Sequence, residues 1–186
     1  MSEGRSAAPS KARVFFALWP DEDIQARLLR QGCELHRRLH GKLTRQESIH
    51  LTLAFLGDVT SEGLVLANEA AAGAQFDSFA LSVDRGGCWR HNNVGWVAPS
   101  SVPDALHALA NSLADRLRAA GFELEDRPYS PHITLVRKAH CRPLDLRLDA
   151  VEWPVRDFVL VESQLDALGS RYTVIGRWPA HGAQSV

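Results

Sequence analysis

Hydrophobic residues in the first half of the chain recur with two spacings, one typical of strands and one typical of helices. Residues 13–19 form a compact apolar run rich in β-formers, which predicts a central strand buried on both faces. Pro20 ends this run, and apolar positions at helical spacing over 24–39 predict a helix. We expect a second strand over 48–56 and a second helix over the alanine- and leucine-rich residues 61–74.

The second half of the chain changes period. Residues 76–83 alternate in polarity, Gly86-Gly87 predicts a turn, and the segments 88–90 and 94–98 should form a hairpin. Leucines at helical spacing predict an amphipathic helix over 103–120. Further strands are predicted over 129–136, 155–161 and 171–178.

This order of elements places helices between strands that have short links to one another. We therefore predict an α+β fold with mainly antiparallel sheet. No Pro/Gly/Ser-rich linker divides the chain, so residues 13–179 should form a single domain. We expect a disordered N-terminal tail over 1–12 and a C-terminal tail over 180–186.

Composition narrows the class of protein. The 186 residues include 21 Lys or Arg and 22 Asp or Glu, and the net charge of −1 gives no global basic field for long nucleic acid. Any contact with nucleic acid should therefore be local, at an end or along a short strand. No stretch approaches the roughly 20 apolar residues of a membrane span, and residues 1–12 lack the apolar core of a signal peptide.

The three cysteines, Cys33, Cys88 and Cys141, are odd in number, far apart and without a C-x-x-C spacing. These features argue against a disulfide framework. We expect reduced cysteines and a cytoplasmic protein without a membrane partner.

An internal repeat is the most informative feature of the sequence. Residues 48–53 read Ser-Ile-His-Leu-Thr-Leu and residues 130–135 read Ser-Pro-His-Ile-Thr-Leu. Because strand side chains alternate between faces, the histidine and the threonine of each copy should share one face, with apolar neighbours in the core. Two such copies predict a pseudo-twofold arrangement in which two lobes face each other.

The repeated residues favour acid/base chemistry on a phosphodiester. Histidine has an unperturbed pKa of about 6.5, so His50 and His132 could act as general base and general acid in one displacement. The hydroxyls of Thr52 and Thr134 could donate to the non-bridging phosphate oxygens. Arg137 lies where the second strand should end and could bind the phosphate in a bidentate manner.

Other interpretations of these residues weigh differently. A single His-x-Thr in a strand is usually part of a solvated sheet face, but that explanation would here require two coincidences. For Arg137, spacing alone fits a surface arginine equally well. Cys33, His36 and His40 share one helical face and could bind a metal, yet no fourth ligand is evident. No carboxylate stands at fixed spacing beside either motif histidine, so we expect neither a metal nor another cofactor.

The motifs with their flanking residues resemble the two-histidine (2H) phosphoesterase superfamily. Within it they look most like the LigT/ThpR branch, the RNA 2′,3′-cyclic phosphodiesterases once described as 2′–5′ RNA ligases. The resemblance extends over about 13–178. The strings that carry it are 14–18, 50–57, 129–137, 162–163 and 171–173.

The resemblance implies a bilobal fold with two mainly antiparallel sheets flanking a central cleft and helices on the outside. It implies hydrolysis of 2′,3′-cyclic phosphate ends of RNA to 2′-phosphomonoesters without metal, and a reverse 2′–5′ ligation by the same groups. Family roles would make His50 and His132 the acid/base pair, with Thr52, Thr134 and Arg137 on the phosphate. The family chemistry favours His50 as the donor to the 3′ oxygen, although the pseudo-symmetry allows the roles to exchange.

The resemblance also indicates partners and competing functions. RNA 3′ ends with a cyclic phosphate, including tRNA fragments and short oligonucleotides, would bind to a monomer, and Phe15, Phe16 or Tyr129 could stack on the terminal base. The alternatives are a 2H enzyme for small cyclic nucleotides, 2′–5′ oligonucleotides or ADP-ribose cyclic phosphate, and a non-catalytic module that binds RNA ends. The intact motifs argue against the last, since a binder needs no proton transfer.

Overall fold

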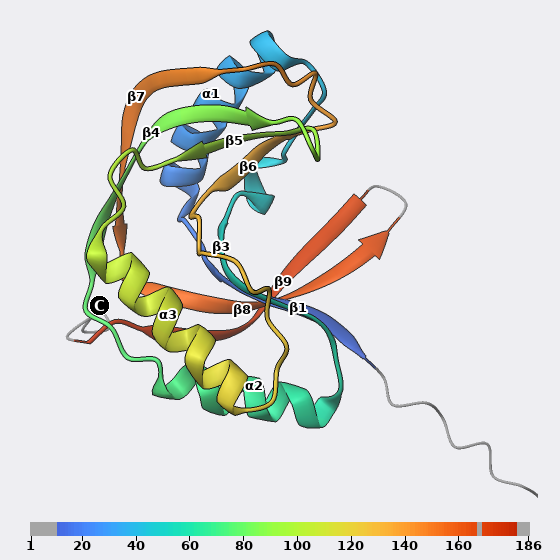
Figure 1. Ribbon diagram of the computed structural model, residues 1–186, viewed down its shortest axis with the longest axis vertical. Coiled ribbons are helices and arrows are strands. Elements are labelled where there is room, and N and C mark those ends of the chain that lie inside the picture. The colour runs from blue at the N-terminus through green and yellow to red at the C-terminus, as the bar shows by residue number, and fades with distance from the viewer. Residues whose placement is uncertain (1–10, 167–168, 182–186) are drawn as a thin grey trace, which may run out of the picture.

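Two antiparallel sheets dominate the computed structural model, which describes residues 11–166 and 169–181 (Figure 1). The first sheet has the order β3 (Leu51–Val59), β1 (Ala12–Leu18), β8 (Asp157–Asp166) and β9 (Gly169–Pro179). The second has the order β2 (Lys42–Leu43), β6 (Ile133–Arg137), β5 (Val94–Ala98), β4 (Phe79–Trp89) and β7 (Asp145–Val155). Every strand pair within the sheets is antiparallel.

The helices are exchanged between the two sheets. Helix α1 (Glu22–Leu39) follows β1 of the first sheet but packs on β5, β6 and β7 of the second. Helix α3 (Asp104–Ala119) follows β5 of the second sheet but packs against β3 and α2 (Ser61–Gly73). A short 3-10 helix, η1 (Gln46–Ser48), precedes β3. The chain therefore crosses between two lobes. The first lobe contains the first sheet with α2 and α3, and the second lobe contains the second sheet with α1, which are the lower and upper parts of Figure 1.

The helix boundaries follow local signals in the sequence. The Asp21 carboxylate accepts a hydrogen bond from the Ile24 N–H at 2.9 Å and caps α1. The Thr60 hydroxyl accepts from the Gly63 N–H at 3.2 Å and caps α2. The predicted helices, the hairpin of β4 and β5, and the α+β class with mainly antiparallel sheets are confirmed.

Strand β1 is buried on both faces, as its apolar run predicts. Val14, Phe16 and Leu18 point into the main hydrophobic core, which continues under both sheets. Phe15 and Ala17 point the other way, into a smaller cluster with residues of β8. Phe15 of this second cluster packs against His50 of the first motif.

The predicted turn at Gly86-Gly87 is wrong, because both glycines lie inside β4. A β-carbon on Gly87 would lie 2.4 Å from the Trp96 ring of the neighbouring strand, so only glycine leaves room for that indole. Strand β7 was not predicted, since its first half is mostly exposed and Pro154 interrupts the pattern. Pro154 is tolerated there because β7 lies at the edge of its sheet.

The expectation of unpaired cysteines is also wrong. A disulfide joins Cys88 at the end of β4 to Cys141 after β6, with Cα atoms 5.5 Å apart, and Cys33 is free and exposed. The two cysteines are 53 positions apart in the sequence, which hides their proximity. They meet because β4 and β6 both flank β5. None of the helices that the structure describes is long and apolar enough to cross a membrane.

The predicted tails fall mainly on residues 1–10 and 182–186, which lie outside the described residues. Three of the predicted tail positions that the structure describes, 12, 180 and 181, have backbone partners in the fold. Ala12 begins β1, and the Ala180 N–H donates to the Arg156 carbonyl at 2.7 Å. The His181 N–H donates to the Phe76 carbonyl at 2.8 Å, which ties the chain end to the first lobe.

Removing the disulfide should lower the free energy of unfolding. Loop-closure entropy for a separation of 53 residues amounts to about 4 kcal/mol in the unfolded chain. Denaturant unfolding of the double variant Cys88→Ala/Cys141→Ala should show this loss, and wild type in excess dithiothreitol should show a similar one. Cys33→Ala is the matched control and should keep the wild-type midpoint. A double variant as stable as wild type would contradict the assignment.

Candidate active site

The two repeated motifs occupy equivalent places in the two sheets. His50 immediately precedes β3 and His132 immediately precedes β6, so each histidine stands just before its strand and not inside it as predicted. Thr52 and Thr134 are the second residues of these strands, and both are half-buried. The repeat therefore places one imidazole and one hydroxyl at the start of a strand in each lobe.

One hydrogen bond recurs in both copies. The Nδ1 atom of His50 lies 2.7 Å from the Ser48 carbonyl oxygen, and Nδ1 of His132 lies 3.0 Å from the Ser130 carbonyl oxygen. Since a carbonyl only accepts, each Nδ1 must carry the hydrogen and donate. The neutral form of each ring therefore has its lone pair on Nε2, which is the atom left for substrate.

Aromatic rings surround His50 on several sides. Phe15 lies 4.9 Å from the His50 ring between centroids, and the Trp19 indole stacks on it at 5.3 Å with an interplanar angle of 2°. Tyr172 approaches edge-on at 5.3 Å. Trp19 follows Leu18, which pairs with Leu51, and so stands next to the residue that precedes β3. These contacts hold the His50 ring in one orientation.

An indole also contacts the second histidine. The Trp89 ring lies 4.4 Å from the His132 ring in an edge-on arrangement, and it contacts Trp96 at 5.5 Å. Trp96 pairs with Thr134, so both project from the same face of the second sheet. Each motif histidine thus has an indole partner, Trp19 directly after β1 and Trp89 at the end of β4.

The environment lowers the pKa of both histidines. The pKa of His50 is lowered from 6.5 to about 4, with burial as the largest cause and positive charge on Arg137 and His132 acting in the same direction, while the hydrogen bond to Ser48 opposes them. Burial likewise lowers the pKa of His132, its bond to Ser130 opposes this, and Arg127 and Arg137 add to the lowering. The positive charge of Arg137 therefore lowers the pKa of both rings, and the charge of His132 also lowers that of His50.

Arg137 is the last residue of β6, at the strand end where the sequence places it. It pairs with Lys42 on one side and Val94 on the other, so Lys42 shares its face of the sheet. Arg127 precedes β6 and forms an exposed ion pair with Glu125 at 2.6 Å. The sequence reasoning missed Arg127, although it stands only five residues before His132.

The aromatic residues predicted to stack on a base have other roles. Phe16 is fully buried in the main core, so the prediction is wrong for it. Phe15 is 4% exposed and packs beneath His50, which leaves no open face for a base. The Tyr129 hydroxyl donates to the Thr52 carbonyl at 3.1 Å, and burial raises the pKa of this phenol. Tyr129 therefore links the flank of one motif to the other.

Trp19, Tyr172 and Trp89 are the site residues that sequence reasoning did not single out. Tyr172 lies in one of the strings that carry the family resemblance, and Trp19 ends the first predicted strand. Their contacts with the histidines depend on strand pairing, which the sequence does not reveal. Trp19 directly follows the end of β1, Tyr172 lies in β9, and Trp89 is the last residue of β4.

The structure provides no assembled metal site among residues 11–166 and 169–181, where no group of three or more His, Cys, Asp or Glu side chains converges. The three helical residues that were considered as metal ligands, Cys33, His36 and His40, have different surroundings. Cys33 is exposed, the His36 Nε2 lies 3.1 Å from the Gly41 carbonyl oxygen, and the His40 ring lies 5.9 Å from that of His140.

Comparison with known proteins agrees with the duplicated site. The family model "LigT like Phosphoesterase" matches the chain twice, over 18–96 and 97–172, with one motif in each half. The chain is 30% identical to the RNA 2′,3′-cyclic phosphodiesterase of Escherichia coli, covering 89% of this chain and 95% of that protein. It is 30% identical to the enzyme of the same name from Thermus thermophilus, covering 91% of each.

The structure is similar as well. The crystal structure of E. coli LigT complexed with 3′-AMP superposes with a TM-score of 0.85 at 28% identity, covering 92% of this chain and 99% of that one. The similarity thus extends over both lobes and both motifs. This chain belongs to the LigT-like phosphoesterase family of 2H enzymes.

Proposed function

We propose that this protein hydrolyses 2′,3′-cyclic phosphate ends of RNA to 2′-phosphomonoesters. The observation that carries the proposal is the pair of imidazoles, each with Nδ1 bonded to a backbone carbonyl and Nε2 left for substrate. The charge of Arg137 acts on the pKa of both rings. The two relatives described above bear the name RNA 2′,3′-cyclic phosphodiesterase, and the similar structure of E. coli LigT was solved with 3′-AMP. A nucleotide phosphate is therefore the substrate class that fits the site.

The proposed reaction is a single in-line displacement at phosphorus. Nε2 of His132 accepts a proton from water as the water oxygen bonds to phosphorus, and the bond from phosphorus to the 3′ oxygen breaks. Nε2 of His50 gives its proton to that leaving oxygen. The products are a 3′-hydroxyl and a 2′-phosphomonoester, and exchange with solvent restores both rings.

The low pKa of His50 suits a proton donor that becomes protonated when the anionic substrate binds. A histidine with a pKa of about 4 is a strong acid once protonated, so it transfers its proton readily to an alkoxide. The anionic phosphate opposes the positive charge of Arg137 and favours the protonated ring. Thr52 and Thr134 are the proposed donors to the non-bridging oxygens, and Arg137 is the proposed partner of the phosphate charge.

Product analysis tests the function directly. An RNA oligonucleotide with a 2′,3′-cyclic phosphate, incubated with the protein and EDTA, should yield only the 2′-phosphomonoester, identified by phosphorus NMR. Chelator should leave the rate unchanged, since none of the proposed steps uses a metal. A cyclic end that persists would refute the function, and a loss of activity in EDTA would refute the metal-free mechanism.

Substitution of the histidines tests their roles. His50→Ala and His132→Ala should each lower kcat by about 10²–10⁴-fold. The double variant should lose much less than the product of the two, because the groups act in one step. A folded single variant with near wild-type activity would exclude that histidine from the reaction.

A diester with a 4-nitrophenolate leaving group separates the two roles. This leaving group needs no proton, so His50→Ala should keep most of its activity on such a diester while His132→Ala should not. Both variants should be measured on the cyclic substrate in parallel. The opposite pattern would assign the donor role to His132.

The pH dependence of kcat/KM should report the depressed pKa values. The proton donor must be protonated and the acceptor must not, so the profile is bell-shaped and reflects the free enzyme. Because both histidine pKa values lie below 6.5, the maximum should lie below pH 6.5 and the rate should fall as the pH rises past it.

Arg137→Gln is the matched test of the cause. Removing this cation should raise both pKa values and move the maximum of kcat/KM to higher pH, while activity falls through weaker phosphate binding. Arg118→Gln, which removes an exposed arginine from α3 in the first lobe, should leave the profile in place. A profile unchanged in Arg137→Gln would show that this charge does not act on the histidines.

A further inference from the structure

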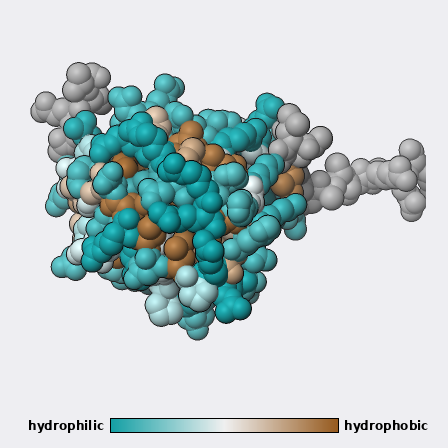
Figure 2. Space-filling view, turned by 90° about the horizontal axis from the view of Figure 1, so that it is seen from above, coloured by the Kyte–Doolittle hydropathy of each residue, from teal (hydrophilic) through white to brown (hydrophobic). Residues whose placement is uncertain are grey.

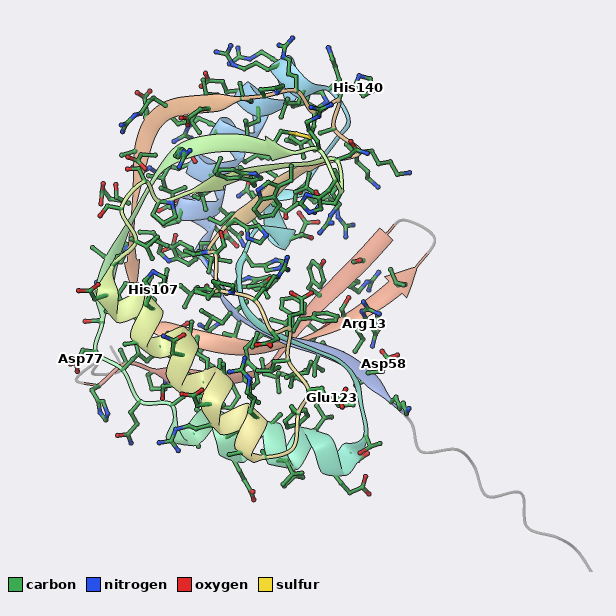
Figure 3. All side chains as sticks on the ribbon, viewed as in Figure 1. Arg13, Asp58, Asp77, His107, Glu123 and His140 are labelled. Carbon is green, nitrogen blue, oxygen red and sulfur yellow. A yellow bond between two sulfur atoms is a disulfide. The ribbon has the colours of Figure 1, made fainter. Side chains whose placement is uncertain are left out.

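A pocket of 490 Å³ lies at the corner of the second lobe where three turns meet. The turns are the end of α1, the tip of the β4–β5 hairpin and the segment that follows β6, and His140 marks this corner in Figure 3. The volume falls within the usual range for small-molecule sites. The residues that line the pocket are Asn92, Asn93, Lys138, Ala139, His140 and Cys141.

Backbone contacts give this pocket a fixed shape. His40, Asn93 and Lys138 adopt positive φ angles of 52°, 55° and 51°, one in each turn. The Ala139 N–H donates to the Asn93 carbonyl at 2.9 Å, and the His140 N–H donates to the Leu39 carbonyl at 2.7 Å. The three turns are thus bonded to one another, and the disulfide of Cys141 joins the same corner to β4.

The chemistry of the pocket favours an anion. Its lining combines an ammonium, an imidazole and two amides, and none of the six lining residues carries a carboxylate. The His40 ring lies 5.9 Å from that of His140, and Arg142 directly follows the pocket residue Cys141 in the chain. The face seen from above in Figure 2 is mostly hydrophilic. Lysine and amide donors of this kind bind phosphate oxygens.

The pocket adjoins the proposed active site along two routes. Lys138 directly follows Arg137 at the end of β6. On the hairpin, His132 contacts Trp89 at 4.4 Å, Trp89 contacts His91 at 6.1 Å, and His91 precedes the pocket residue Asn92. An RNA chain whose cyclic end lies at His132 would therefore pass Trp89 before it reaches the pocket.

We infer that this pocket is a second phosphate subsite, which holds a backbone phosphate of the RNA on the 5′ side of the cyclic end. The inference rests on the proposed function and adds substrate length to it. Lys138, His140 and the asparagine amides contact that phosphate, and Trp89 offers a ring beside the intervening nucleotide. The enzyme then prefers an oligonucleotide end to a cyclic mononucleotide, which cannot reach the pocket.

Two substrates test this subsite: adenosine 2′,3′-cyclic monophosphate, and a trinucleotide that ends in the same cyclic group. In Lys138→Gln, kcat/KM for the trinucleotide should fall by about 10-fold, as for the loss of a charged hydrogen bond. The value for the mononucleotide should not change. His140→Gln should act in the same direction, and the melting temperature of each variant shows whether it folds.

Salt dependence provides a second measurement. For the trinucleotide, the slope of log kcat/KM against log salt concentration should become shallower by about 0.7 in Lys138→Gln, the value for one single-strand phosphate contact. Arg118→Gln is the control, because it removes one positive charge from α3 in the other lobe. It should leave both the trinucleotide rate and the slope as in wild type.

The outcomes separate this inference from the function on which it rests. If wild type hydrolyses neither substrate, the proposed function fails. If wild type hydrolyses both and folded Lys138→Gln keeps the trinucleotide rate and slope, the subsite is overturned. An equal loss on both substrates also overturns it, because the effect would then arise at the reacting phosphate.

Discussion

The proposed chemistry depends on one hydrogen bond that the fold makes twice. In each lobe an imidazole Nδ1 donates to the carbonyl oxygen two residues earlier, at Ser48 and at Ser130. The bond sets the tautomer and the ring orientation together, and it directs the reactive Nε2 away from the backbone. Because a backbone carbonyl accepts it, the bond depends on the chain conformation just before the strand, and not on the serine hydroxyl.

The packing that orients the His50 ring also lowers its pKa. Phe15, Trp19 and Tyr172 remove water from His50, and Arg137 adds a nearby positive charge. Both effects disfavour a protonated imidazole in the free protein, and an anionic phosphate opposes the second. In the proposed mechanism, the bound phosphate therefore makes protonation of His50 less unfavourable, so that phosphate binding and protonation of the ring favour each other.

The crossing of the chain between the lobes holds the two motifs in fixed positions relative to each other. Helices α1 and α3 each pack on the sheet opposite to the strand that precedes them, so the lobes share one continuous core. The Tyr129 hydroxyl adds a direct bond from the segment before β6 to Thr52 in β3. Two half-sites that are local in sequence become one site only through these connections.

The sequence by itself determined the features that depend on neighbouring residues. Helical periodicity predicted α1, α2 and α3, the apolar run at β1 predicted a strand buried on both faces, and the duplicated His-x-Thr string predicted two half-sites. The resemblance of the flanking strings predicted the family. The helices, the strand and each copy of the motif are contiguous in the sequence, so local backbone preference and side-chain alternation are enough to predict them.

Only the tertiary structure decided which distant residues meet. It placed Trp19 and Trp89 on the two histidines, showed Gly87 to be space for an indole and not a turn, and paired Cys88 with Cys141. The contacts of the histidines and the disulfide join residues that are distant in sequence, and two of them reach from β4 across β5 to the ends of β6. Their free energy comes from side chains packing across strand pairs, and no local pattern encodes which strands will pair.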